Sequence, residues 1–312
     1  MVSPYKEQRG LSLIELLVAL AIALVLVIVV SYSFLGSKNA FRATDEQTQL
    51  YEEGRFALEL LGKNIRSAGF MTAIDFTDKV RYFEDPESGV FPYTAPIASR
   101  TYALRGCAGG VAPTSFACIT TPSPGTANAF TVAYFTDKPD SVQNPSGVSN
   151  KDLGVGLDCI GEEAIEFPLV DGGGTLYLIR NTFFLTQRTY DDDGVTKVLK
   201  ELSCVGGGAG GQQPLFKGVH DMQIRYGRSV SESALEDQAV DQYFKAEEIE
   251  ADDQWHSVIN ARVCLVMETN RRTGAVAGND YADCDGVMQT APAGFVRRSF
   301  ISTFNLRNRV QQ

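Results

Sequence analysis

One carboxylate of this sequence, Glu15, lies among apolar residues. Glu15 lies within an apolar stretch from Leu11 to Leu35, and residues 16–30 are apolar without interruption. As a helix, the 25 positions of this stretch would span about 37 Å, more than the ~30 Å hydrocarbon core of a membrane. A carboxylate in lipid costs several kcal/mol unless it meets a partner. We therefore expect Glu15 to bind a positively charged group, and its position five residues after Gly10 is informative.

The six cysteines are the second group with chemical potential. All of them follow the apolar stretch, and the basic residues Lys6 and Arg9 before it favour a cytoplasmic N-terminus, with the rest of the chain across the membrane. An even number of cysteines in an oxidising compartment indicates disulfides, and the sequence has no CxxC pair for zinc. Our hypothesis is nearest-neighbour pairing, namely Cys107–Cys118, Cys159–Cys204 and Cys264–Cys284.

Three further patterns have a structural as well as a chemical reading. His220 and Asp221 suggest part of a triad, but no G-x-S-x-G elbow is present and both lie at the entry to a strand. The glycines of 206–211 fit G-x-G-x-x-G without a helix to follow. The segment 190–194 is a hairpin-turn signal, with a contribution to a calcium site as the alternative. We therefore expect no enzyme activity, no cofactor and no metal.

Charge separates the bulk of the chain from its C-terminus. Lys and Arg number 28 against 38 Asp and Glu, a net charge of −10 at pH 7, which argues against nucleic-acid binding because such a surface repels phosphate. The acidic run 247–253 is typical of a solvated face, or of a face that selects a basic partner. The C-terminal arginines suit exposed strand positions, with a DNA-contacting patch as the alternative. They are Arg297, Arg298, Arg307 and Arg309.

A single long helix is expected to carry the apolar stretch out of the membrane. No proline occurs between Pro4 and Pro86, and apolar residues recur at helical spacing up to the C-cap residue Gly69. A helix over 11–68 would be about 87 Å long. No globular domain of this size needs such a rod, whereas a filament subunit does, with the first half among neighbours and the second against its own head.

The chain beyond residue 70 predicts a β-rich head and hence an α+β fold. Short apolar segments alternate with Gly, Pro and Asp, with long loops near 84–128, 137–158, 205–214 and 270–292. The expected strands lie near residues 130–135, 176–181, 183–190, 197–204, 222–226, 258–268 and 295–305.

The N-terminal segment RGLSLIELLVAL closely resembles the class III signal of type IV prepilins and pseudopilins, which is a basic leader, a Gly, a hydrophobic residue and a Glu at mature position five. The resemblance implies cleavage between Gly10 and Leu11 by prepilin peptidase, N-methylation of Leu11, and docking of Glu15 on the terminal amine of a neighbouring subunit. The implied divisions are a leader 1–10, a transmembrane and filament-core helix 11–35, a helix half on the head 36–69, and a periplasmic head 70–312.

Further segments resemble the PilW family of minor type IV pilins. They are EEGRFALELLGKNIRSAGF, GVHDMQIRYG, WHSVINARVCLVMET and RRSFISTFNLRNR, whereas residues 71–215 match nothing known to us. The order of elements is also similar to the large minor pseudopilin J of type II secretion. These resemblances imply a type IV pilin-like fold with a long N-terminal helix packed on an antiparallel head of one or two sheets.

The resemblance also implies a function and partners. The expected protein is a minor pilin that helps prime pilus assembly and sits at or near the tip, supporting adhesion and motility. It is held in the inner membrane by a single span, with a periplasmic head, before it enters the extracellular pilus. Its implied partners are prepilin peptidase, other minor pilins and the major pilin, a large tip adhesin and the inner-membrane assembly platform. The alternatives are a type II secretion pseudopilin, a DNA-uptake subunit and an anchored periplasmic enzyme.

Overall fold

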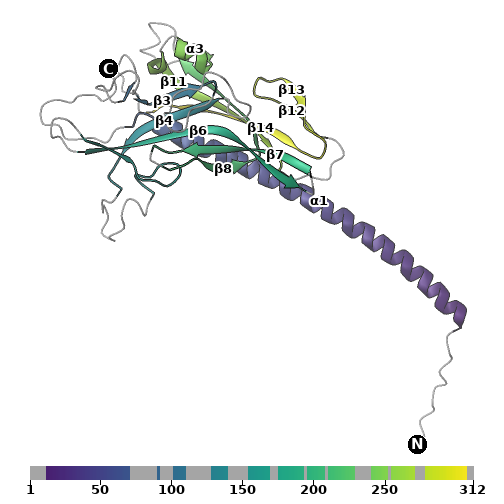
Figure 1. Ribbon diagram of the computed structural model, residues 1–312. Helices are drawn as coiled ribbons and strands as arrows, with labels where there is room; N and C mark the ends of the chain where they lie inside the picture. Colours follow the sequence, from purple (N-terminus) through teal and green to yellow (C-terminus); the bar gives the residue numbers. More distant parts are fainter. Residues whose placement is uncertain are drawn as a thin grey trace, which may run out of the picture.

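A long helix leaves a head made of β-sheets (Figure 1). The computed structural model describes residues 12–70, 90–91, 101–109, 128–139, 154–168, 175–192, 195–207, 210–228, 240–251, 254–270 and 278–307. Helix α1 is Leu13–Ser67, with 55 residues and a length of about 82 Å. The expected α+β architecture of a long N-terminal helix on antiparallel sheets is therefore confirmed.

The end of α1 agrees with the glycine signal in the sequence. Gly69 has φ of 72°, a left-handed conformation that favours glycine just after a helix. Its N–H donates to the carbonyl of Ala133 at 3.0 Å. The helix therefore stops where the chain is tied to the head.

The head contains a six-stranded and a four-stranded antiparallel sheet. The six-stranded sheet has the order β3 (Leu104–Cys107), β4 (Ala129–Thr136), β6 (Thr175–Asp192), β7 (Val195–Val205), β8 (Gln213–Lys217), and β5 (Ile165–Pro168) also pairs with β6. The four-stranded sheet has the order β10 (Gln242–Phe244), β9 (Val219–Arg228), β11 (Val258–Glu268), β14 (Arg297–Asn305). Smaller elements are β1 (Val90–Phe91) with β2 (Thr101–Tyr102), β12 (Asp280–Ala282) with β13 (Met288–Thr290), α3 (Ala246–Ala251) and a 3-10 turn (Trp255–Ser257).

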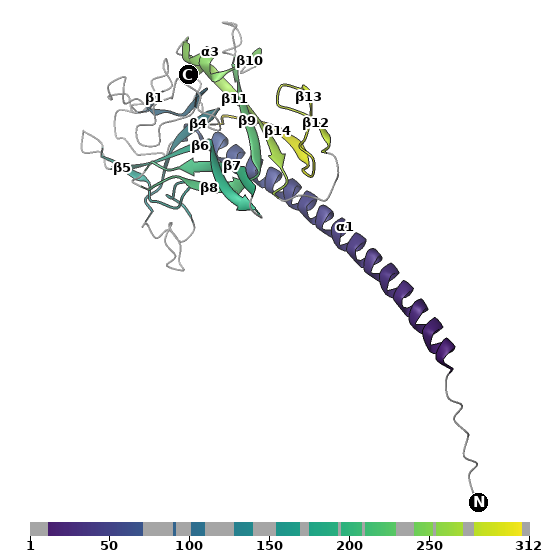
Figure 2. The same cartoon turned by 45° about the vertical axis from the view of Figure 1, so that its right-hand side comes forward.

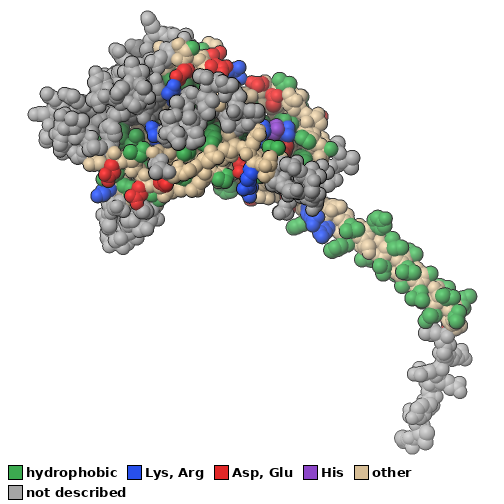
Figure 3. Space-filling model, in the orientation of Figure 1, with side chains coloured by type: hydrophobic (Ala, Val, Ile, Leu, Met, Phe, Trp, Pro, Cys, Tyr) green, Lys and Arg blue, Asp and Glu red, His purple; other side chains and the backbone are tan. Residues whose placement is uncertain are grey.

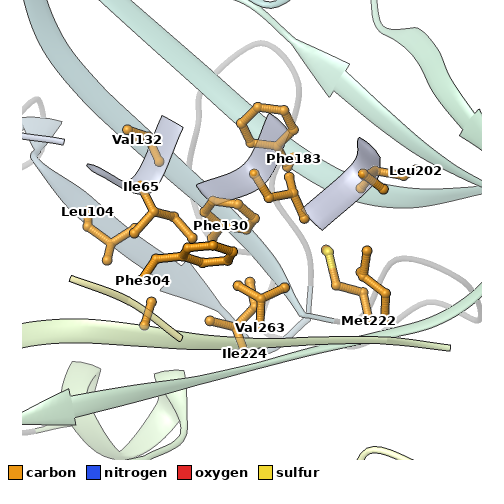
Figure 4. Packing of buried hydrophobic residues seen from close by; sticks show 14 of the residues in the cluster. Ile65, Leu104, Phe130, Val132, Phe183, Leu202, Met222, Ile224, Val263 and Phe304 are labelled. Carbon is orange, nitrogen blue, oxygen red and sulfur yellow. The ribbon is translucent and has the colours of Figure 1, made fainter. Parts of the chain in front are cut away.

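The second half of α1 shares one core with both sheets. Its residues Leu61 and Ile65 are fully buried, as are Phe183 of the six-stranded sheet and Met222 of the four-stranded sheet. Ile65 lies among side chains from both sheets, close to Phe304 of β14 (Figure 4). This shared burial holds the head on the second half of the helix.

The predicted break in the strand pattern at residue 182 needed correction, and the correction has a physical reason. The segments 176–181 and 183–190 form the single strand β6, because the polar residues at the expected break find buried partners. Asn181 donates to Asn64 of α1 at 2.7 Å, and the hydroxyls of Thr131 and Thr182 are 2.8 Å apart. The predicted loops 84–128 and 270–292 contain short strands, and the acidic run begins in the helix α3.

Glycines in α1 allow β14 to lie directly against the helix. A Cβ on Gly54 would lie 2.7 Å from the Phe300 ring, and a Cβ on Gly62 would overlap the Phe304 ring. The guanidinium of Arg66 stacks over the same Phe304 ring, 5.4 Å from its centroid. Close packing of α1 on β14 therefore depends on these two glycines.

We expect Gly62→Val to destabilise the folded head. The added side chain must displace Phe304, and overpacking of this kind costs about 1–3 kcal/mol. Denaturant unfolding of the detergent-solubilised chain measures the effect, with Gly36→Val as the control because nothing lies within 4 Å of a Cβ there. Equal unfolding midpoints for Gly62→Val and the unmodified chain would contradict the packing role.

Candidate assembly surface

The first half of α1 is apolar on all sides and has no cover among the described residues. Leu13 is 78% exposed and Val30 is 66% exposed, and apolar side chains cover the face of this part of the helix that Figure 3 shows. By length and composition, α1 is long and apolar enough to cross a membrane. A helix that is hydrophobic all round belongs in lipid or among other helices. We call residues 13–35 of α1 the assembly surface.

Glu15 closes the start of this surface through a capping box with Ser12. The Ser12 N–H donates to Glu15 Oε2 at 3.0 Å, and the Glu15 N–H donates to the Ser12 hydroxyl at 3.3 Å. The S-x-x-E pattern before an apolar run is the sequence signal of this cap, although the sequence reading above gave Glu15 an intermolecular role only. Glu15 Oε1 makes no hydrogen bond within the described part of the chain. That oxygen remains available to a cation.

Glu15 lines a shallow depression on the helix. Its volume is about 310 Å³, and Ala19, one turn after Glu15, also lines it. The lining residues are Ile14, Glu15, Val18, Ala19 and Ile22. An amine that approached Glu15 would therefore enter an apolar recess. Gly10 and Leu11, the predicted cleavage and methylation residues, lie outside the described residues.

Disulfides brace the head that carries this helix. The structure joins Cys159 to Cys204 and Cys264 to Cys284, which are two of the three hypothesised pairs. Cys107 is also disulfide-bonded, and Cys118, its hypothesised partner, lies outside the described residues. The oxidised cysteines agree with a head that matures in an oxidising compartment.

His220 lies in a small polar pocket lined by residues of β7, of the four-stranded sheet and of the β12–β13 hairpin. Lys200 Nζ donates to the His220 carbonyl at 2.9 Å, and Arg297 and Tyr281 also line the pocket, whose volume is about 300 Å³. Burial, followed by the positive charges of Arg297 and Lys200, lowers the pKa of His220 to about 4. The Asp221 carboxylate accepts from the adjacent N–H of Met222 at 2.9 Å. Within the described residues, His220 and Asp221 thus do not form the hydrogen-bonded pair of a triad.

The depressed pKa of His220 predicts acid sensitivity. The folded state keeps this imidazole neutral, whereas the unfolded state protonates it near pH 6.5, so its contribution to stability is present above pH ~6.5 and is lost as the pH falls toward about 4. We expect the difference in unfolding midpoint between pH 7 and pH 4.5 to be smaller in His220→Gln than in the unmodified chain. Identical pH dependence in the two proteins would be evidence against this role.

The glycine-rich segment and the arginines bind groups of the head itself. The Gly210 N–H donates to Glu162 at 3.0 Å, which makes this an acidic loop that would repel phosphate; Gly208 lies outside the described residues. Arg297 pairs with Glu268 at 2.6 Å, and Arg298 stacks 5.0 Å from the Tyr51 ring. These two arginines point to opposite faces of β14, so they do not form one patch. Arg309 lies outside the described residues.

The acidic run 247–253 contributes one organised residue that the sequence reading missed. Glu250 of α3 accepts from Trp255 Nε1 at 2.7 Å and from Arg105 Nε at 3.1 Å. Of the turn 190–194, Asp191 and Asp192 belong to β6, which pairs with β7 as a hairpin. In the part of the chain that the structure describes, no three His, Cys, Asp or Glu side chains gather as a metal site.

Comparison with protein families gives two matches. Residues 182–308 match the family described as Type IV Pilus-assembly protein W, and residues 5–31 match the Prokaryotic N-terminal methylation motif. The first match reaches from within β6 past β14 and includes the whole four-stranded sheet, and the second contains Gly10, Leu11 and Glu15. No curated protein and no solved structure matches the chain.

Proposed function

Because the two family matches support a prepilin-type minor pilin of the PilW family, we propose that this chain helps to prime type IV pilus assembly and sits at or near the pilus tip. One observation carries the proposal: the second half of α1 is buried in the core of the head, whereas the first half has no cover among the described residues. Lipid covers that helix before assembly, and neighbouring helices cover it afterwards.

The order of events follows from the N-terminal chemistry. Prepilin peptidase removes residues 1–10 and methylates Leu11, and residues 11–35 hold the chain in the inner membrane with the head in the periplasm. During assembly, the Leu11 amine of one subunit meets the Glu15 carboxylate of another. In a low dielectric an unpaired carboxylate is penalised, so this contact fixes the register between the two helices. The helix half 36–69 remains on its own head.

The size of the head supports a place at the end of the filament. Helices pack about 8–10 Å apart, whereas this head contains two sheets in addition to the helix, and packed layers of this kind are each about 10 Å thick. A fibre in which every subunit carried such a head would be crowded at its surface. The end of the fibre has room for it, next to other minor pilins, the large tip adhesin and the surface that the pilus binds during adhesion and motility.

A clean deletion tests this proposal. Surface pili are counted by electron microscopy, twitching is scored on plates, and secreted exoproteins are measured in parallel. We expect loss of pili and twitching with normal secretion, restored by the unmodified chain. Loss of secretion with pili intact would overturn the proposal in favour of a type II pseudopilus, and intact pili together with intact secretion would contradict both.

A further inference from the structure

We propose that the outer edge of β14, from Ile301 to Asn305, accepts an extended acidic segment of a neighbouring, different pilus subunit as an added strand. We call these five residues the β14 edge. The inference rests on the proposed function in one respect, namely that subunits held in one membrane have their α1 helices pointing the same way. The hydrogen-bonding geometry of the edge is independent of that function.

The backbone groups of the β14 edge alternate between two directions. Leu306 N–H donates to the Ile259 carbonyl at 2.9 Å, and Thr269 N–H donates to the Val296 carbonyl at 3.0 Å. Together with the register Asn260↔Asn305, these bonds direct the even-numbered residues of β14 toward β11. The N–H and C=O groups of residues 301, 303 and 305 therefore point away from the sheet.

Among the outward backbone groups of β14, only those at the start of the strand have a hydrogen-bond partner in the described residues. The Arg297 N–H donates to Asn279 Oδ1 at 2.8 Å, and Asn279 Nδ2 donates to the Arg297 carbonyl at 2.8 Å. Next along, the Ser299 hydroxyl donates to the carbonyl of Ala282 in β12. The Asn279 side chain thus makes the two hydrogen bonds to Arg297 that a neighbouring strand would make. No described residue makes such bonds to the backbone of the β14 edge.

The β14 edge lacks the features that protect sheet edges. Residues 299–305 contain no charged residue, proline or glycine, and the pairing of β14 with β11 runs over nine residues without a bulge. The edge strand β8 carries Pro214 and Lys217, while β3 has four residues and β10 has three. Charges, prolines and short length each prevent strand addition. Unlike β8, β3 and β10, β14 is therefore an edge strand that is suited to receive a partner.

Antiparallel pairing between the β14 edges of two copies of this chain does not suit the direction of β14. Gly54 lies under Phe300 and Gly62 lies under Phe304. The eight residues between the two glycines extend about 12 Å along the helix, and the four residues between the two phenylalanines extend about 13 Å along the strand. The strand runs along α1 in the same direction, and β14 lies beside the helix in both views (Figures 1 and 2). Antiparallel pairing of two β14 edges would turn the two α1 helices in opposite directions.

Charge and shape beside the β14 edge favour an acidic segment. Arg262, opposite Thr303 in the register, is exposed on the outer face, and Arg298 is exposed on the helix side over Tyr51. Neither arginine forms a salt bridge within the described residues. Ile301, 48% exposed, and Arg262 line a groove of about 440 Å³ on the outer face, and Asp283 and Asp285 line it too. Asp285 pairs with Arg225, and Asp283 accepts hydrogen bonds from its own hairpin. Arg262 is thus the charged side chain of the groove that has neither kind of partner within the described residues. The groove can receive side chains of the added strand, and the arginines can bind its carboxylates.

The test combines crosslinking with a backbone change in the full-length chain in cells. A photocrosslinking residue replaces Ile301, and the crosslinked peptide is identified by mass spectrometry with and without Thr303→Pro. We expect one crosslink, to an extended acidic segment of another pilin-type subunit, and a loss of at least about fivefold with Thr303→Pro. Proline removes an outward N–H and leaves the pairing with β11 intact. Thr303→Val, which keeps that N–H, should retain the crosslink.

The outcomes separate this inference from the proposed function. An unchanged crosslink in a Thr303→Pro chain whose unfolding midpoint matches that of Thr303→Val would overturn the inference, as would a crosslink to a second copy of the chain or to a helix. If the crosslinking result overturns the inference but deletion of the chain abolishes pili, the proposed function stands without the inference. If pili persist after deletion and Ile301 still crosslinks to an acidic strand, the inference stands and the function fails.

Discussion

Replacing Glu15 with valine should leave signal cleavage intact and reduce incorporation of the chain into pili about a hundredfold. Glu15 Oε2 accepts from the Ser12 N–H at 3.0 Å, and Glu15 lines the shallow depression together with Ala19. The proposed partner is the Leu11 amine of a neighbouring subunit. Removal of one partner of an ion pair in a low dielectric costs about 3 kcal/mol or more because the other charge stays unpaired, which corresponds to about a hundredfold.

Immunoblotting of sheared pili and of membranes measures the Glu15→Val effect. Glu52→Val is the matched control, because Glu52 is exposed on the head half of the same helix, and it should assemble normally. Gly10→Val gives the opposite defect, a chain that retains its ten-residue leader. Equal amounts of Glu15→Val and unmodified chain in sheared pili would contradict the docking role.

Removal of the Cys159–Cys204 disulfide should destabilise the head by about 4 kcal/mol. The bridge closes a loop with a sequence separation of 45, and loop-closure entropy of that size is worth about 4 kcal/mol. Cys204 is fully buried in the main core, and the Cys159 N–H donates to Asn181 Oδ1 at 2.9 Å. Asn181 in turn binds Asn64 of α1 at 2.7 Å. The bridge therefore supports the polar contact between the six-stranded sheet and the helix.

Denaturant unfolding of the double alanine variant measures this loss. The comparison is a double alanine variant of Cys264 and Cys284, whose bridge has a sequence separation of 20 and an expected contribution of about 3 kcal/mol. That bridge joins β11 to the β12–β13 hairpin, away from the main core. The Cys159 and Cys204 variant should thus unfold at the lower denaturant concentration and with lower accumulation in cells. If the Cys264 and Cys284 variant unfolded at the lower denaturant concentration instead, the loop-closure entropy would not determine which disulfide contributes more stability.

The features that sequence alone determined are those set by local pattern. An uninterrupted apolar run without proline fixes the first half of α1, and Gly69 ends the helix because its left-handed backbone suits glycine. Strand β11 occupies the predicted residues 258–268 because its many apolar residues, three valines among them, suit a central strand. The position of Glu15 within the apolar run is likewise read from the sequence, and its role in docking stays a prediction. These signals need only neighbours in the chain, so no knowledge of the fold was required.

Tertiary structure decided the features that depend on residues far apart in the chain. Strand β6 continues through Asn181 and Thr182 because α1 and β4 supply hydrogen-bond partners, and Asn64 is 117 residues away from Asn181. The glycines of α1 acquire their importance only when β14 lies on them. The β14 edge exists because that strand ends the sheet order. A polar residue breaks a strand only where burial leaves it unpaired, and a strand has an open edge only where no other strand follows, so both depend on the assembled fold.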